Sequence, residues 1–202
     1  MNKKNFLRIP YAQSVHGKDE IDAVVNVLKT STQMGKNFSK MEDKIAKIFE
    51  KKYGLLTNSG TSALMLAAEA SDLPKGSEVI TAAFTFATTV TPILKNGLIP
   101  VFMDAKKDTL NIDASRIKEF ISENTSAIWI PNMLGNFPDW DEIRKIADEK
   151  GLLVIEDSAD TLGGELRGAS TGSRTDISIT SFYGSHIINC AGNGGWIGVN
   201  DT

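Results

Sequence analysis

The stretch Leu152-Leu153-Val154-Ile155-Glu156-Asp157 decides the fold class, because four large apolar residues run directly into two acids. A short, continuous apolar run of this kind is typical of a strand buried on both faces of a parallel sheet. A carboxylate at the end of such a strand can pair with a protonated ring nitrogen, bind a metal ion or cap the next helix. This stretch alone leaves all three alternatives open.

Strand patterns like this one recur along the chain and alternate with helix patterns. The candidate strands are Gly54–Thr57, Glu78–Ala83, Leu98–Met103, Ala127–Pro131, Leu152–Glu156, Asp176–Phe182 and Trp196–Val199. Helices are expected between them near 61–71, 87–96, 113–122 and 139–149, the last two with N-caps at Asp113 and Asp139. The alternation predicts an α/β fold with a mostly parallel, seven-stranded sheet and helices on both faces.

Two further helices are expected before the first strand. Apolar residues recur at helical spacing at Ile21, Val24, Val25 and Leu28, and again at Met41, Ile45, Ile48 and Phe49. Ser39 and Glu42 form the pattern of a capping box, which predicts that the second helix begins there.

Composition excludes several classes of protein. The 202 residues include 22 Lys and Arg against 25 Asp and Glu, a net charge of −3 that disfavours nucleic acid as the main partner. No apolar run approaches the roughly 20 residues of a membrane helix, and no apolar segment follows Lys3 and Lys4 as in a secretory signal. Cys190 is the single cysteine, interpreted as a buried small residue, and no spacing suggests a metal site. We therefore expect a cytoplasmic protein without a metal centre or membrane partner.

The carboxyl ends of parallel strands are where such sheets bind ligands, which selects candidate segments before any family is considered. The segments are Asn58–Ser62, Phe84–Phe86, Asn132–Asn136, Asp157–Asp160 and Ser181–His186. Gly60, Thr61 and Ser62 open a helix and offer N–H groups and hydroxyls to an anion, although the same residues also suit an ordinary N-cap. His186 follows Ser181 by five residues in a glycine-flanked turn and is either a catalytic group or a hydrogen-bonded structural residue. His16, in a polar loop, is interpreted as structural.

Four ordered motifs together resemble the DegT/DnrJ/EryC/StrS family of sugar aminotransferases, which are pyridoxal-phosphate enzymes of the aspartate-aminotransferase fold type. The motifs are Thr57-Asn58-Ser59-Gly60-Thr61-Ser62-Ala63-Leu64, Phe84-Thr85-Phe86-Ala87-Thr88-Thr89, Glu156-Asp157-Ser158-Ala159-Asp160 and Ser181-Phe182-Tyr183. The resemblance runs from about Arg8 to the last residue. It implies a seven-stranded large domain and a homodimer.

The resemblance also implies roles for individual residues. Gly60, Thr61 and Ser181 match the residues that hold the cofactor phosphate, and Ser62 is a possible additional donor. Phe86 matches the ring that stacks on the pyridine, and Asp157 matches the carboxylate that pairs with the pyridine nitrogen and keeps it protonated. Asp160 stands where aminotransferases commonly have Gln, and we expect it too to contact the cofactor.

His186 occupies the position of the lysine that binds the cofactor covalently in this family. One branch carries this replacement, the 3-dehydratases of nucleotide-linked 4-keto-6-deoxyhexoses, which make 3,6-dideoxysugars of bacterial surface polysaccharides. Asn132-Met133-Leu134-Gly135-Asn136 and Arg8-Ile9-Pro10-Tyr11-Ala12 resemble the same branch. Imidazole cannot bind the cofactor covalently as an amine does, so the resemblance implies pyridoxamine 5′-phosphate, or pyridoxal 5′-phosphate, held non-covalently. His186 is then the catalytic base.

These residues are compatible with three functions of the protein. The main expectation is dehydration at C3 of a nucleotide-diphospho-4-keto-6-deoxyhexose. The alternatives are a nucleotide-sugar aminotransferase of the same family and a catalytically silent protein that binds the cofactor or a sugar nucleotide. Family members are roughly twice as long, so residues 1–202 are expected to be the N-terminal and large cofactor-binding domain, with the small C-terminal domain absent.

Overall fold

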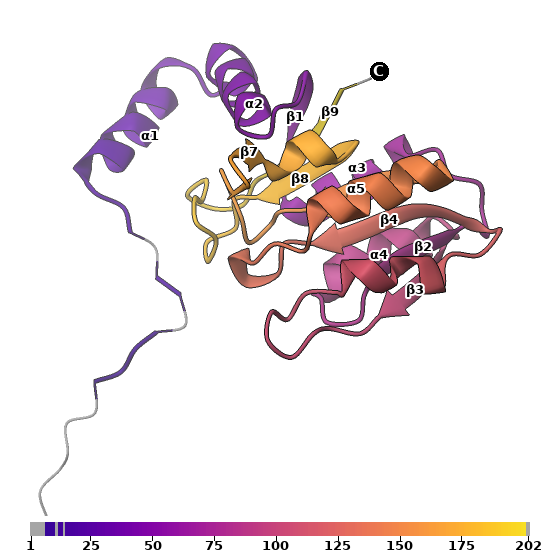
Figure 1. Ribbon diagram of the computed structural model, residues 1–202. Coiled ribbons are helices and arrows are strands. Elements are labelled where there is room, and N and C mark those ends of the chain that lie inside the picture. The colour runs from indigo at the N-terminus through magenta and orange to yellow at the C-terminus, as the bar shows by residue number, and fades with distance from the viewer. Residues whose placement is uncertain (1–6, 11, 14, 201–202) are drawn as a thin grey trace, which may run out of the picture.

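The computed structural model describes residues 7–10, 12–13 and 15–200 (Figure 1). Tyr11, which belongs to one of the motifs above, lies outside the described residues. The strands of the main sheet are β1 (Tyr53–Thr57), β2 (Glu78–Ala82), β3 (Ile99–Met103), β4 (Thr125–Pro131), β5 (Leu153–Asp157), β8 (Ile177–Ser181) and β9 (Gly195–Val199). The helices are α1 (Lys18–Thr30), α2 (Lys36–Ile48), α3 (Gly60–Ala70), α4 (Ala87–Lys95) and α5 (Trp140–Lys150).

The seven strands form one sheet in the order β1-β9-β8-β5-β4-β2-β3, which confirms the predicted fold class. All pairings from β8 through β3 are parallel, whereas β9 is antiparallel to both β8 and β1. Six strands therefore end at the same edge of the sheet, and β9 begins there.

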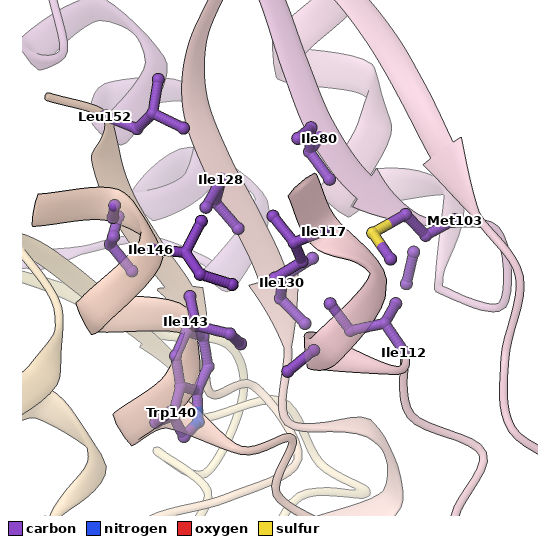
Figure 2. Packing of buried hydrophobic residues seen from close by; sticks show 14 residues of the cluster. Ile80, Met103, Ile112, Ile117, Ile128, Ile130, Trp140, Ile143, Ile146 and Leu152 are labelled. Carbon is purple, nitrogen blue, oxygen red and sulfur yellow. The ribbon is translucent and has the colours of Figure 1, made fainter. Parts of the chain in front are cut away.

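Helices cover both faces of the sheet, because apolar residues on adjacent positions of each strand point to opposite sides. Ile128 and Ile130 of β4 pack with Ile143 and Ile146 of α5 in one cluster (Figure 2). Their neighbours Ala127 and Trp129 belong to a second cluster with residues of α3. Both faces of β4 are thus buried, as a parallel strand in the middle of a sheet requires.

Helix α5 begins and ends at signals that the sequence contains. The side chain of Asp139 accepts a hydrogen bond from Glu142 N at 3.3 Å, so Asp139 is the predicted N-cap. Gly151 follows the last turn with a φ of 67°, the left-handed conformation that favours glycine after a helix.

Helix α2 begins earlier than the capping box predicts. Gly35 is its N-cap, and Ser39 lies inside the first turn with its N–H bonded to Gly35 O. The carboxylate of Glu42 instead accepts from Leu56 N at 2.9 Å and joins the helix to β1. The capping-box prediction is wrong because Glu42 is used in a tertiary contact.

Three other local features differ from expectation. The segment Ala114–Phe120 is a 3₁₀-helix rather than an α-helix, although Asp113 caps it as predicted. The short strands β6 (Glu165–Leu166) and β7 (Ala169–Ser170) form a small hairpin that the sequence did not suggest. Cys190 is exposed, so its interpretation as a buried residue is wrong. Short 3₁₀ turns also cover Met133–Gly135 and Thr171–Arg174.

Helix α1 lies apart from the rest of the ribbon and buries none of its residues (Figure 1). In the part of the chain that the structure describes, no helix combines the length and apolar character needed to cross a membrane.

Candidate functional site

A cavity of about 690 Å³ opens at the edge of the sheet where the parallel strands end. Seven of the eight residues selected from the sequence line it: Gly60, Thr61, Phe86, Asp157, Asp160, Ser181 and His186. They come from four segments of the chain, and the outermost two residues, Gly60 and His186, are 126 positions apart in the sequence. The eighth, Ser62, is not among the lining residues.

The N-terminus of α3 forms one wall of the cavity. Ser59 is the N-cap, and its hydroxyl oxygen accepts from Ser62 N at 3.1 Å and lies 3.1 Å from Ser62 Oγ. Ser62 is therefore engaged with the cap. The N–H groups of Gly60 and Thr61 have no acceptor among the described residues, so both are available to a ligand. The segment is thus an N-cap and a potential anion site at the same time.

Ser181, at the end of β8, lies directly against Gly60. A Cβ atom at position 60 would lie 2.6 Å from Ser181 Cβ and 2.7 Å from Ser181 Oγ. Gly195, at the start of β9, is equally constrained, because a Cβ there would lie 2.3 Å from Ser59 O. Glycine at these two positions lets the helix terminus and the Ser181 hydroxyl approach the same point.

Asp157 lies at the end of β5 and is only 5% exposed. Its Oδ2 accepts from Thr89 Oγ1 at 2.7 Å, and its Oδ1 accepts from Ala159 N at 3.1 Å. Burial raises the pKa of Asp157 above its ordinary value, and the hydrogen bond from Thr89 opposes this shift. Because the residues after it form a turn rather than a helix, Asp157 is not a helix cap. No cluster of metal-ligating residues occurs in the described ranges.

His186 lies across the cavity beside Asp160. Its Nε2 is 3.8 Å from Asp160 Oδ1, and the ring of Tyr183 contacts the imidazole edge-to-face at 5.9 Å between centroids. Asp160 Oδ2 accepts from Leu134 N at 3.1 Å, which joins it to the turn after β4. The Nδ1 atom is buried and has no hydrogen-bond partner among the described residues.

A buried polar network behind Asp157 was not anticipated from the sequence. Glu156 is fully buried, and its carboxylate accepts from Asn132 Nδ2 at 3.1 Å, Ser158 Oγ at 3.0 Å, Thr175 Oγ1 at 3.2 Å and Ser178 Oγ at 2.6 Å. The signal that could have predicted this network is the alternation of side chains along a strand, since successive residues point to opposite faces of the sheet. If Asp157 points into the cavity, Glu156 must point to the opposite face.

Comparisons with known proteins show the family of the chain and its fold. The model of the DegT/DnrJ/EryC1/StrS aminotransferase family matches residues 14–202. A dTDP-4-dehydro-2,6-dideoxy-D-glucose 3-dehydratase of Saccharopolyspora spinosa is 38% identical over 187 residues, covering 89% of this chain and 40% of that protein. The lipopolysaccharide biosynthesis protein RfbH of Salmonella typhimurium is 39% identical over 196 residues, covering 93% of this chain and 45% of that protein.

The structural comparison points to the same group. The GDP-4-keto-6-deoxy-D-mannose-3-dehydratase of E. coli, solved with bound hydrated PLP, superposes with a TM-score of 0.91 at 31% identity, over 98% of this chain and 52% of that one. Aminotransferases match as well, for example a UDP-2-acetamido-2-deoxy-3-oxo-D-glucuronate aminotransferase of Pseudomonas aeruginosa at 32% identity, over 94% of this chain and 53% of that protein. The chain spans about half the length of the proteins that it matches.

Proposed function

The chain belongs to the DegT/DnrJ/EryC1/StrS aminotransferase family, and on that basis we propose that it takes part in the C3 dehydration of a nucleotide-diphospho-4-keto-6-deoxyhexose. The observation that carries this proposal is the imidazole of His186 at the cavity, because none of the described residues lining the cavity is a lysine. Without an amine in reach, a cofactor aldehyde has no covalent anchor there. An imidazole instead supplies a base.

The residues of the cavity fit pyridoxamine 5′-phosphate or pyridoxal 5′-phosphate. The free N–H groups of Gly60 and Thr61, with the hydroxyls of Thr61 and Ser181, form a set of donors suited to the phosphate. The side chain of Phe86 is 72% exposed, which leaves its ring available to stack on the pyridine. The carboxylate of Asp157 would pair with the pyridine nitrogen. Ser62 bonds to the Ser59 hydroxyl, so it would support the N-cap rather than donate directly to the phosphate.

When bound, pyridoxamine 5′-phosphate would supply an amine for the C4 ketone of the sugar and a ring system able to take up electrons. Asp157 would keep the ring nitrogen protonated. His186 would accept a proton at Nε2 and return it to the C3 hydroxyl, which then leaves as water. Asp160 Oδ1 lies 3.8 Å from Nε2 and would orient the imidazole during both transfers.

Support for the substrate class comes from the relatives. Two of those described above are 3-dehydratases by name, one for a dTDP-linked and one for a GDP-linked keto sugar, and a third is a lipopolysaccharide biosynthesis protein. The proposal therefore names the class and not one nucleotide. It includes a homodimer as the working form.

Turnover and covalent trapping together test this function. A full-length form of the protein is purified and incubated with pyridoxamine phosphate and with dTDP-, CDP- or GDP-linked 4-keto-6-deoxyhexose, and the dehydrated sugar is detected by mass spectrometry. Separately, the protein is treated with pyridoxal phosphate and borohydride. We expect dehydration of at least one substrate and no lysine adduct. A cofactor–lysine adduct with amino-sugar product would support the aminotransferase, and binding without turnover of any substrate would support the silent protein.

Variants of the two histidines assign the base. His186→Asn should abolish dehydration, whereas His16→Asn, in an exposed loop, should not change it. His186→Lys should lose dehydration and gain a covalent cofactor bond at residue 186 after borohydride treatment. If the adduct forms on another lysine and residue 186 stays unmodified, His186 does not face the cofactor.

A further inference from the structure

Two threonine hydroxyls near the start of α4 form a short chain that ends at Asp157. Thr85 Oγ1 donates to Thr89 Oγ1 at 3.0 Å, and Thr89 Oγ1 donates to Asp157 Oδ2 at 2.7 Å. Thr89 is 1% exposed, so this hydroxyl is withdrawn from bulk water. The roles assigned above leave both threonines unexplained.

The geometry of α4 brings Thr89 to the same cavity as Phe86. Phe86 is the N-cap of α4, and Thr89 N donates to Phe86 O at 3.0 Å, so the two residues are one helical turn apart. Residues at this spacing lie on the same side of a helix. A single turn therefore offers an aromatic ring to the cavity and a hydroxyl to the carboxylate behind it.

The two hydrogen bonds of Asp157 fix its carboxylate. Thr89 holds Oδ2 and the backbone N–H of Ala159 holds Oδ1, so the carboxylate cannot rotate without losing both donors. Each oxygen keeps a second lone pair for another donor. Thr85 matters because it donates to the oxygen of Thr89, which leaves the hydroxyl proton of Thr89 free to point at Asp157.

We propose that Thr89 is a positioning residue, whose hydroxyl keeps the Asp157 carboxylate charged and aimed at the ring nitrogen of the cofactor, with Thr85 setting the direction of the Thr89 proton. The inference rests on the cofactor site of the proposed function. Burial opposes the charged carboxylate, as does the nearby negative charge of Asp160, while Thr89, Ala159 and His186 favour it. Among the described residues, Thr89 is the one whose side chain donates a hydrogen bond to the Asp157 carboxylate.

The test measures the cofactor rather than the reaction. Pyridoxamine 5′-phosphate labelled with ¹⁵N in the ring is bound to the protein, and its affinity and ring-nitrogen chemical shift are recorded. Because only part of the contribution of this hydrogen bond to the charged carboxylate reaches the cofactor, Thr89→Val and Thr89→Ala should weaken binding by up to roughly tenfold. They should also move the ¹⁵N shift toward that of the unprotonated ring. Thr89→Ser keeps the hydroxyl and should restore both values.

Two further variants complete the design. Thr85→Val leaves the Thr89 side chain intact and should produce a smaller change in the same direction. Thr91→Val is the control, since Thr91 is exposed and its hydroxyl donates to Ala87 O of its own helix. Its affinity and ¹⁵N shift should equal those of the unmodified protein.

Failure of this inference differs from failure of the proposed function. If the unmodified protein binds the labelled cofactor, and Thr89→Val binds it with unchanged affinity and shift, Thr89 has no positioning role. The same follows if Thr89→Ser behaves like Thr89→Ala, because then the methyl group and not the hydroxyl matters. If the unmodified protein does not bind the cofactor, the cofactor site itself is wrong. If the protein binds the cofactor normally but does not dehydrate any substrate, the affinities and ¹⁵N shifts of the Thr89 variants still decide whether Thr89 positions Asp157.

Discussion

Replacing Glu156 by alanine should destabilise the protein more than any surface change, because this carboxylate is fully buried and accepts four hydrogen bonds. Its donors come from β8 and from the segments that follow β4, follow β5 and precede β8. Lys51 is buried nearby, where its ammonium group donates to Gly172 O at 2.8 Å and is attracted by Glu156. Alanine removes the acceptor and the negative charge together.

The expected magnitude follows from what remains after the change. Each buried donor left without an acceptor costs about 1–3 kcal/mol, and Lys51 loses the attraction of the negative charge of Glu156. Two hydrogen bonds among the former donors would remain and reduce this cost. Asn132 Nδ2 donates to Ser158 Oγ at 2.7 Å, and the hydroxyls of Thr175 and Ser178 bond each other at 2.9 Å. We therefore expect Glu156→Ala to lower the free energy of unfolding by about 3 kcal/mol. Glu156→Gln, which keeps one acceptor, should lower it by about 1–2 kcal/mol.

Urea unfolding at pH 7, followed by far-UV circular dichroism, measures these differences. The denaturant slope should stay the same, so that the midpoint reports stability. Glu123→Ala, at an exposed glutamate, is the control and should change the unfolding free energy by less than about 0.5 kcal/mol. A loss below about 1 kcal/mol for Glu156→Ala would refute the reasoning, since the network would then be satisfied without its central acceptor.

Three further predictions concern Lys51, Asp157 and Gly60. Burial lowers the pKa of Lys51 to about 8 from 10.5, so the unfolded chain binds more protons between these values. The unfolding free energy should consequently rise with pH across that window by up to about 3 kcal/mol, and Lys51→Met should lack this rise in urea titrations at each pH. Asp157→Asn should reduce dehydration by roughly two orders of magnitude while cofactor affinity falls less, because the phosphate donors are intact; unchanged turnover would remove Asp157 from the site. Gly60→Ala places a Cβ 2.6 Å from Ser181 Cβ and should lower both the melting temperature and the affinity for pyridoxal phosphate, with an overpacking cost of about 1–3 kcal/mol. Gly184→Ala, which has open space around it, is the matched control, and equal behaviour of the two variants would contradict the close approach.

The sequence determined the fold class, because strand and helix patterns are local. The run Leu152–Glu156 and its six counterparts all became strands of one sheet. Helix α5 begins after Asp139 and ends before Gly151, as the capping preference of the Asp side chain and the backbone preference of Gly require. The rule that ligands gather where parallel strands end was sufficient to choose the segments that meet at the cavity.

Local patterns were insufficient where a residue has a tertiary partner. Glu42 has the spacing of a capping box, but its carboxylate instead accepts a hydrogen bond from the backbone of β1. The apolar residues Ile21 and Leu28 form an amphipathic helix as expected, yet α1 buries neither of them against the described chain. Propensity does not reveal which of these contacts is made, since the energy of each depends on groups distant in the sequence.

Only the tertiary structure decided how the site is supported. The position of β9 between β1 and β8, antiparallel to both, brings Gly195 against Ser59. Thr89 and Asp157 are 68 positions apart, and Lys51 and Thr175 are 124 apart, so neither contact has a signature in a sequence window. These pairs form because buried polar groups must find partners when the two faces of the sheet are covered, and that requirement exists only once the chain has folded.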